Sequence, residues 1–277
     1  MTEFESSRHY RERVEAAIGR SLRSAPAPGE DPWAVRAASF RLDPRRKLEA
    51  NTRALIDLIE PGDSVLDIGG GAGRLGLPVA LHCREMINLE PSAAMRAEFD
   101  ASARDARITN ARCLDASWPG DADGLEADIV MVANVTYFVR DIQPFLEAMD
   151  RCARRRAIIS VWSVPPPSHG ASLIEFFHGQ APTITPSHRE LLPVLWDMGL
   201  LPEVHVLPDA FWRARERPTT RTEAVELALL RGNATELEGA AARVEAHFDD
   251  LFETTPSGFL PKWIPATREL LITWTKA

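Results

Sequence analysis

The sequence of 277 residues contains few cysteines. The three that are present, Cys83, Cys113 and Cys152, are too few and too scattered for a disulfide framework or a zinc site. Each sits in or beside an apolar run, so we expect three buried free thiols and no bound metal. Because such thiols persist in a reducing compartment, we expect a cytoplasmic protein.

The chain also lacks an excess of basic residues and a long apolar run. Its net charge is −8, so no overall basic field favours nucleic acid. No apolar run approaches the ~18 residues that span a membrane, and the N-terminus has no apolar signal-peptide core. We therefore expect neither nucleic acid nor a membrane as a partner, and we leave the oligomeric state open between monomer and homodimer.

The N-terminal sixty residues are predicted to be helical with breaks. The stretch "YRERVEAAIGRSL" (10–22) has apolar residues at helical spacing, and the Pro- and Gly-rich residues 24–32 are predicted to be a linker. A second helix is predicted from Asp43, as its cap, and Pro44, in its first turn, up to the Pro-Gly pair at 61–62.

From residue 64 onward, short apolar stretches alternate with helical patterns. The stretches predicted as strands are 64–69, 85–90, 111–116, 127–134, 156–162, 202–207 and 268–277. Nearly continuous apolar strands that alternate with helices indicate a parallel sheet covered on both faces. The sequence therefore predicts an α/β fold with a doubly wound, mostly parallel, seven-stranded sheet.

A long connection precedes the last predicted strand. It contains two helical patterns, each opened by a predicted capping box, Thr220 with Glu223 and Thr235 with Glu238, and then the turn-rich loop "TTPSGFLPKW". Because connections of this length in compact domains tend to be functional, we expect the helical insertion 208–262 to cover a substrate. The alternative is a surface or dimer-contact insertion.

The loop "DIGGGAGRLG" at 67–76 fits two ligand-binding patterns. The glycines at 71, 73 and 76 fit the G-x-G-x-x-G turn that binds a dinucleotide pyrophosphate on helix N–H groups. Asp67, however, would repel a phosphate and attract a cation. S-adenosylmethionine carries a sulfonium and an ammonium group and no phosphate, so Asp67 favours this ligand.

At this point the sequence resembles the class I S-adenosylmethionine-dependent methyltransferases. The resemblance covers about residues 60–165, with four motifs in order: "VLDIGGGAG", "INLEPSAAM", "CLDASWP" and "ADIVMVANVTYFV". It implies a Rossmann-like methyltransferase fold, with S-adenosylmethionine as cofactor and S-adenosylhomocysteine as product. The cofactor-binding residues that it implies are Asp67, Gly69, Gly70, Gly71, Gly73, Glu90, Pro91, Asp115, Ala116 and Asn134.

Within the family, Glu90 corresponds to a carboxylate that accepts hydrogen bonds from the ribose hydroxyls. Asp115 corresponds to the acid that accepts a bond from the adenine amino group. The segment from Asn134 lacks the two prolines of the Asn-Pro-Pro-aromatic motif, and it looks more like that of the small-molecule members. Tyr137 and His169 are the candidate general bases. Tyr137, Phe138 and Trp162 are the candidate substrate-pocket residues.

The sequence is therefore predicted to be a methyltransferase that uses in-line displacement on a small-molecule acceptor. Residues 1–45 are expected to form a helical segment that acts as a lid, and residues 46–277 the methyltransferase domain. The alternatives are an RNA or protein methyltransferase and a non-catalytic homologue that binds S-adenosylmethionine. A nicotinamide-dependent oxidoreductase is disfavoured by Asp67.

Overall fold

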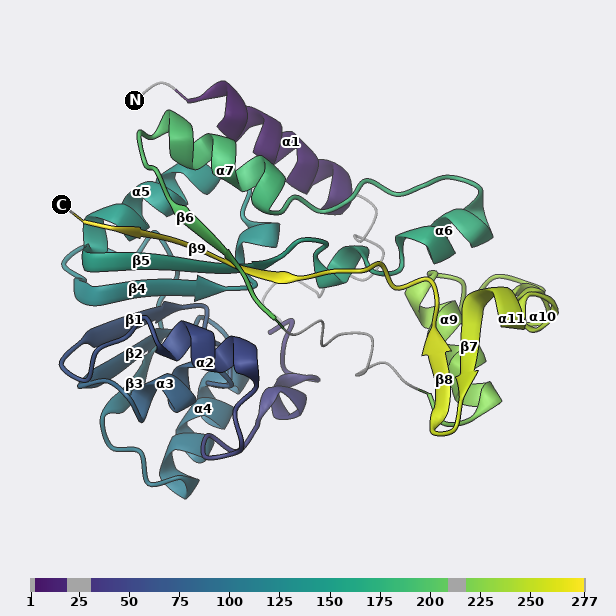
Figure 1. The fold of residues 1–277 in the computed structure, drawn as a ribbon, viewed down its shortest axis with the longest axis horizontal. Coiled ribbons are helices and arrows are strands. Elements are labelled where there is room, and N and C mark those ends of the chain that lie inside the picture. Colours follow the sequence, from purple (N-terminus) through teal and green to yellow (C-terminus); the bar gives the residue numbers. More distant parts are fainter. Residues whose placement is uncertain (1–2, 19–30, 209–217, 277) are drawn as a thin grey trace.

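The structure is a computed structural model, which describes residues 3–18, 31–208 and 218–276. Its centre is a seven-stranded sheet with the order β3-β2-β1-β4-β5-β9-β6 (Figure 1). Six of these strands run in one direction, and β9 runs in the opposite direction between β5 and β6. The strands are β1 (Ser64–Ile68), β2 (Glu85–Leu89), β3 (Ala111–Leu114), β4 (Ala127–Ala133), β5 (Ala153–Trp162), β6 (Glu203–Val206) and β9 (Glu269–Thr275). The predicted doubly wound, mostly parallel sheet is confirmed.

Helices cover both faces of this sheet, as continuous apolar strands require. Alternate residues of β1 face opposite layers, so Leu66 and Ile68 join one hydrophobic cluster and Val65 joins the other. The first layer is α1 (Glu5–Ile18), α5 (Ile142–Cys152) and α7 (His188–Asp197). The second is α2 (Ala50–Ile56), α3 (Gly76–Ala80) and α4 (Ala93–Asp105).

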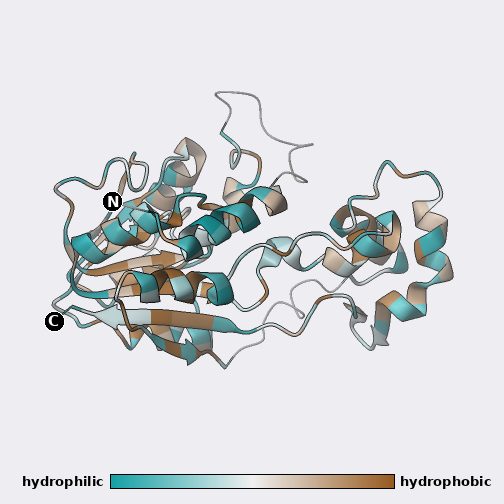
Figure 2. Cartoon of the chain, turned by 90° about the horizontal axis from the view of Figure 1, so that it is seen from above, coloured by the Kyte–Doolittle hydropathy of each residue, from teal (hydrophilic) through white to brown (hydrophobic). Residues whose placement is uncertain are grey.

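A second lobe lies beside the carboxyl edge of the sheet (Figures 1 and 2). Its core is largely aromatic, with Phe248 stacked on Phe252 at 5.0 Å and Trp263 edge-on to Phe252. The lobe consists of α6 (Ala171–His178), α9 (Arg221–Arg231), α10 (Ala240–Ala246), α11 (Phe248–Leu251) and the hairpin of β7 (Phe252–Thr255) and β8 (Gly258–Pro261).

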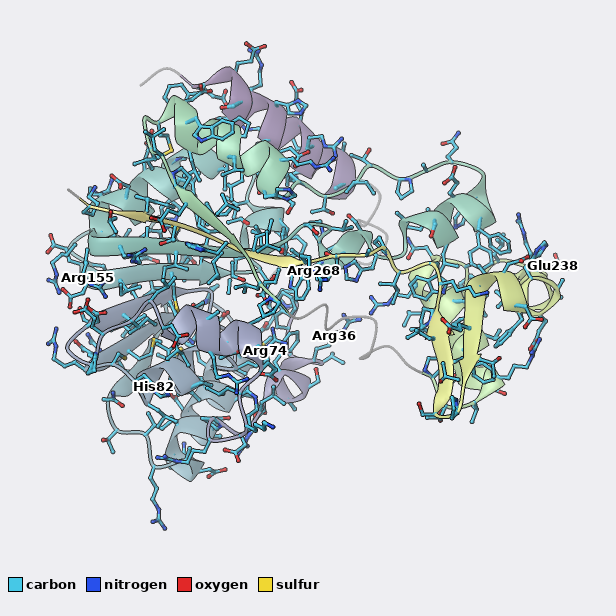
Figure 3. The ribbon with its side chains drawn as sticks, in the orientation of Figure 1. Arg36, Arg74, His82, Arg155, Glu238 and Arg268 are labelled. Atoms are coloured by element: carbon cyan, nitrogen blue, oxygen red, sulfur yellow. The ribbon has the colours of Figure 1, made fainter. Side chains whose placement is uncertain are left out.

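The lobe confirms one predicted capping box and corrects the other. Thr220 and Glu223 form the box at the start of α9. Helix α10 instead begins after Gly239, whose φ of +74° breaks the helical path that the second box required. Glu238 lies on the outer side of the lobe (Figure 3). The segment predicted as a turn-rich loop contains the end of β7 and all of β8, because a short turn lets both strands pair.

The helix predicted from Asp43 is also shorter than expected. Asp43 caps a single turn, accepting from the backbone N–H of Arg45 at 2.8 Å. The chain is extended at Glu49, with ψ of 152°, so α2 begins only at Ala50. Of the predicted linker 24–32, only residues 31 and 32 lie within the described residues.

Phe248→Ala tests whether the aromatic core holds the second lobe together. We expect the free energy of unfolding of the lobe to fall by about 3–5 kcal/mol, because the change leaves a cavity among buried rings. Hydrogen exchange should then rise across 218–264 and stay slow in the central sheet. Leu230→Ala, on an exposed residue of the same lobe, is the control. Equal exchange rates in both variants would contradict the expectation.

Candidate functional site

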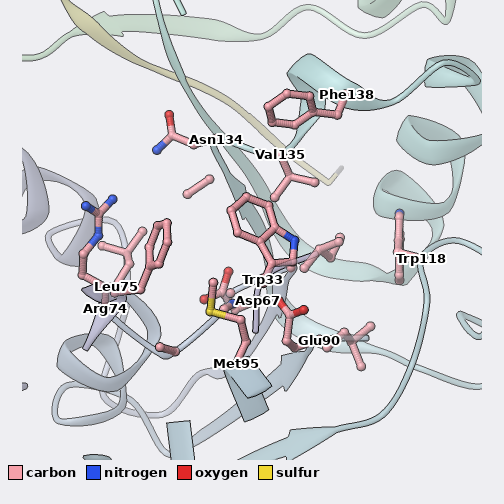
Figure 4. A pocket seen from close by; sticks show the side chains of 18 of the residues that line it. Trp33, Asp67, Arg74, Leu75, Glu90, Met95, Trp118, Asn134, Val135 and Phe138 are labelled. Carbon is pink, nitrogen blue, oxygen red and sulfur yellow. Dashed lines mark hydrogen bonds between the residues drawn. The ribbon is translucent and has the colours of Figure 1, made fainter. Parts of the chain in front are cut away.

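A cavity of about 620 Å³ opens at the carboxyl edge of the parallel strands (Figure 4). This is within the size range of small-molecule sites, and it lies where ligands bind in open α/β sheets. Its walls come from the loops after β1, β2, β3 and β4 and from the segment that precedes α2. The predicted site residues that line it are Asp67, Gly69, Gly70, Gly71, Glu90, Pro91, Ala116, Asn134, Phe138 and Trp162.

The glycine loop passes directly over the carboxylate of Asp67. A Cβ on Gly70 would lie 2.3 Å from Asp67 Oδ2 and 2.6 Å from Asn88 Oδ1, so only glycine fits. Gly73 does not line the cavity: a Cβ there would meet Leu77 and Phe99 at 2.7 Å. Gly70 therefore serves the ligand site, whereas Gly73 serves the contact between the loop and the helices below it.

Asn88 fixes this loop from the neighbouring strand, where it is paired in register with Asp67. Its Oδ1 accepts from the backbone N–H of Gly70 and its Nδ2 donates to the carbonyl of Gly71, both at 3.0 Å. The sequence analysis did not identify Asn88 as a site residue. The available signal was a polar residue inside the otherwise apolar stretch "EMINLE".

Asp67 is a buried carboxylate with an unsatisfied oxygen. The residue is only 1% exposed, and Oδ1 has no hydrogen-bond partner among the residues that the structure describes. Burial, together with the nearby charge of Glu90, raises its pKa to about 7. Removing such an oxygen from water is costly, so the site fits a ligand that brings a positive charge or a donor to it.

Glu90 also faces the loop. Its Oε2 accepts from the backbone N–H of Gly71 at 3.0 Å, and its Oε1 accepts from that of Ser92 at 2.8 Å. Burial raises the pKa of this carboxyl, and the two backbone donors oppose that shift. Each oxygen retains acceptor capacity, which fits the predicted pair of ribose hydroxyls.

Asp115 lies outside the cavity lining. Its carboxylate is largely exposed and pairs with Arg96 at 2.8 Å. Its neighbours Ala116, Ser117 and Trp118 do line the cavity, and the indole of Trp118 donates to the carbonyl of Phe145 at 3.1 Å. The third motif thus reaches the cavity with the residues that follow Asp115, and not with Asp115 itself.

Tyr137 lies behind the cavity wall. Its hydroxyl donates to Asn134 Oδ1 at 2.9 Å and accepts from the backbone N–H of Trp162 at 2.6 Å. Burial, with smaller contributions from nearby charge, raises its pKa well above the ordinary value. Tyr137 therefore holds Asn134, which has φ of +62° at the end of β4, against the end of β5.

His169 lies in a different cavity, of about 500 Å³, beside Ser168, Thr185 and Trp263. The ring is 1% exposed, its Nε2 lies 3.1 Å from the carbonyl of Val164, and burial lowers its pKa. Neither Tyr137 nor His169 lines the main cavity, and their catalytic roles stay predictions.

The segment 31–42 closes one side of the main cavity with Trp33, Phe40 and Leu42. Asp31 anchors it, accepting from Ser92 Oγ at 2.7 Å and from the backbone N–H of Ala94 at 3.1 Å. These bonds, led by the one from Ala94, lower the pKa of Asp31. Sequence periodicity gave no signal for this contact.

Known proteins with similar sequences or folds include methyltransferases. Residues 66–161 match the model of a methyltransferase domain. A comparison with curated proteins found no match. The solved structures that share the fold include a putative methyltransferase from Bacillus halodurans (TM-score 0.54, 11% identity, covering 81% of this chain and 97% of that one). They also include a SAM-dependent methyltransferase from Thiobacillus denitrificans in complex with S-adenosylhomocysteine (TM-score 0.53, 13% identity, covering 92% of this chain and 99% of that one).

Asp67→Asn tests the buried charge. The folded protein holds a proton on Asp67 between about pH 4 and pH 7 that the unfolded chain has released, so this group lowers stability as pH rises. The variant should lose that dependence, up to about 1.4 kcal/mol per pH unit. Urea unfolding at several pH values measures it.

The matched control is Asp115→Asn, which alters an exposed carboxylate near the same cavity. It should leave the slope of unfolding free energy against pH as in the wild type between about pH 5 and pH 7. If Asp67→Asn keeps the same slope of unfolding free energy against pH as the wild type, Asp67 is ionised throughout this range and the expectation is wrong.

Proposed function

We propose that the chain is a class I, S-adenosylmethionine-dependent methyltransferase that methylates a small-molecule acceptor in the 620 Å³ cavity. The match of residues 66–161 to the model of a methyltransferase domain supports this proposal. One observation carries this proposal. A single cavity joins the buried carboxylate of Asp67, the carboxylate of Glu90 and an apolar wall that contains Phe138 and Trp162.

The residues around the glycine loop fit the cofactor. Asp67 would face its positively charged end, and Glu90 would accept from its ribose hydroxyls. Ala116 and Trp118 would lie along the adenine. When bound, S-adenosylmethionine supplies an electrophilic methyl group, and the protein chiefly holds the two reactants in line. Asn134, fixed by Tyr137, would border the place of transfer.

The shape and charge of the cavity support a small acceptor. Trp162, Phe138 and Val135 give this part of the lining an apolar surface, which is typical of sites for small molecules. The net charge of −8 disfavours a nucleic-acid acceptor. The described residues that line the cavity include none from 218–262, so the cap role predicted for the insertion stays a prediction.

Residues 31–42 belong to the segment 1–45 that is predicted to act as a lid. Trp33 meets Phe40 edge-on at 5.8 Å, and Asp31 holds this pair against the start of α4. Both rings line the cavity, so a bound cofactor would be shielded from water on this side. We propose that this segment retains the cofactor.

Glu90→Gln and Asp67→Asn test the cofactor assignment. Each removes a charge that would interact with the ligand, so S-adenosylhomocysteine should bind at least about tenfold more weakly, or about 1.4 kcal/mol. Calorimetry near pH 8 measures the dissociation constant. Asp100→Asn, on the exposed side of α4, is the control. Unchanged affinity in both test variants would refute the site, as would failure of the wild type to bind.

Asp31→Asn tests the lid. Weakening the contact with Ser92 and Ala94 should make S-adenosylhomocysteine dissociate about fivefold faster, as expected for a lost capping bond of about 1 kcal/mol. Stopped-flow tryptophan fluorescence measures the rate. Asp43→Asn, which alters the turn directly after this segment at a side chain that bonds to the backbone of Arg45, should leave the rate unchanged. Equal rates in the two variants would show that the segment does not retain the cofactor.

A further inference from the structure

Two of the carboxylates that line the main cavity belong to strands that lie far apart in the sheet. Glu90 follows β2 and Glu269 begins β9, and both line the cavity. The sheet order between them is β2-β1-β4-β5-β9, so four strand spacings, about 19 Å, separate the two positions. The proposed cofactor residues lie in or directly after β1, β2, β3 and β4, which leaves Glu269 at the acceptor end.

Neutral donors hold the Glu269 carboxylate in place. Its Oε1 accepts from Ser160 Oγ at 2.5 Å, and its Oε2 accepts from Asn51 Nδ2 at 2.8 Å. Among the described residues, no lysine or arginine forms an ion pair with Glu269. Glu49, in the same cavity, differs because Arg46 lies 3.4 Å from it. Glu269 therefore combines a fixed orientation with a carboxylate that makes no direct ion pair among the described residues, although Arg46 and Arg74 line other parts of the same cavity.

Apart from Ser160, the part of β5 beside Glu269 contributes an apolar side chain. The register partner of Glu269 is Trp162, and Phe138 lines the same cavity with nearly half of its surface exposed. In such a partly desolvated place, a carboxylate attracts a cation more strongly than it would in water, and it repels another anion. Two of the roughly four acceptor positions of the carboxylate are occupied by Ser160 and Asn51, so others remain for a ligand.

We propose that Glu269 determines acceptor specificity and that the acceptor is an amine with an apolar body. This inference rests on the proposed function. The amine nitrogen would lie against Glu269, and its apolar part against Trp162 and Phe138.

The chemistry of the step balances for an amine. An acceptor that binds as an ammonium ion first releases one proton to solvent water, and the free-base nitrogen then uses its lone pair to form the bond to the methyl carbon. The carbon–sulfur bond breaks and its electron pair stays on sulfur. Positive charge thereby moves from sulfur to nitrogen, and Glu269 stabilises the charge that develops there. No base is needed during transfer, since the product leaves as an ammonium ion.

Three probes of matched shape test this proposal: 2-phenylethylamine, 2-phenylethanol and 3-phenylpropanoate. Each is titrated into protein saturated with S-adenosylhomocysteine, and calorimetry measures its dissociation constant. We expect the wild type to bind the amine at least about tenfold more tightly than the alcohol or the carboxylate. Glu269→Gln, which keeps the shape and removes the charge, should lose most of this preference.

Glu49→Gln is the matched control, because it neutralises a carboxylate of the same cavity that already faces an arginine, and it should keep the preference. Ser160→Ala leaves Glu269 charged but less firmly held, and it should weaken amine binding severalfold. If Glu269→Gln fails to fold, the dissociation constant of the amine in Ser160→Ala tests the proposal instead.

Equal binding of the three probes, no binding of any at millimolar concentration, or an unchanged preference in Glu269→Gln would each overturn the amine assignment. Tighter binding of the alcohol would point to a hydroxyl acceptor and overturn it as well. Binding of S-adenosylhomocysteine to the wild type is measured first. If it binds and the amine preference is absent, only this inference fails; if it does not bind, the proposed function fails too.

Discussion

The buried charge of Asp67 constrains the structure around it. Its carboxylate lies at the end of the central strand β1, beneath a loop that comes so close that a Cβ on Gly70 or Gly76 would lie within 3 Å of Oδ2. Asn88 and Glu90 hold the loop by its backbone, which fixes its path without covering Asp67 Oδ1. Gly70 and Gly76 are thus required by a carboxylate of the protein itself. Gly76, which completed the dinucleotide-like pattern, is required by Asp67 rather than by a phosphate.

Much of the fold was readable from the sequence because its strands are short, apolar and bounded by turn residues. All seven predicted strands are present in the sheet, and the loops after β1, β2, β3 and β4 meet at one cavity. Parallel strands bring their carboxyl ends to one edge, so the residues that follow them converge whatever the loops contain. This is why Glu90 and Asn134 could be placed from the sequence without any knowledge of their contacts.

Contacts between distant segments could not be read in this way. Asp31 meets Ser92, and Glu269 meets Asn51 and Ser160, across separations of 61, 218 and 109 residues. None of these pairs forms a local pattern. Helix boundaries failed for a related reason: Asp43 and Thr235 have the side chains of good caps, but the backbone departs from the helical path at Glu49 and at Gly239. Tyr137 was recognised as important, yet only the structure shows that it faces Asn134 and Trp162 from behind the wall.

The reversal of β9 separates the two halves of the site along the chain. Because this strand runs antiparallel, its first residue reaches the carboxyl edge, directly after the segment that returns from the second lobe. The residues proposed for the cofactor lie between 67 and 134, whereas Glu269 follows more than a hundred residues later. A substitution at the start of β9 would therefore change the proposed acceptor contact of Glu269 and leave the residues between 67 and 134 as they are.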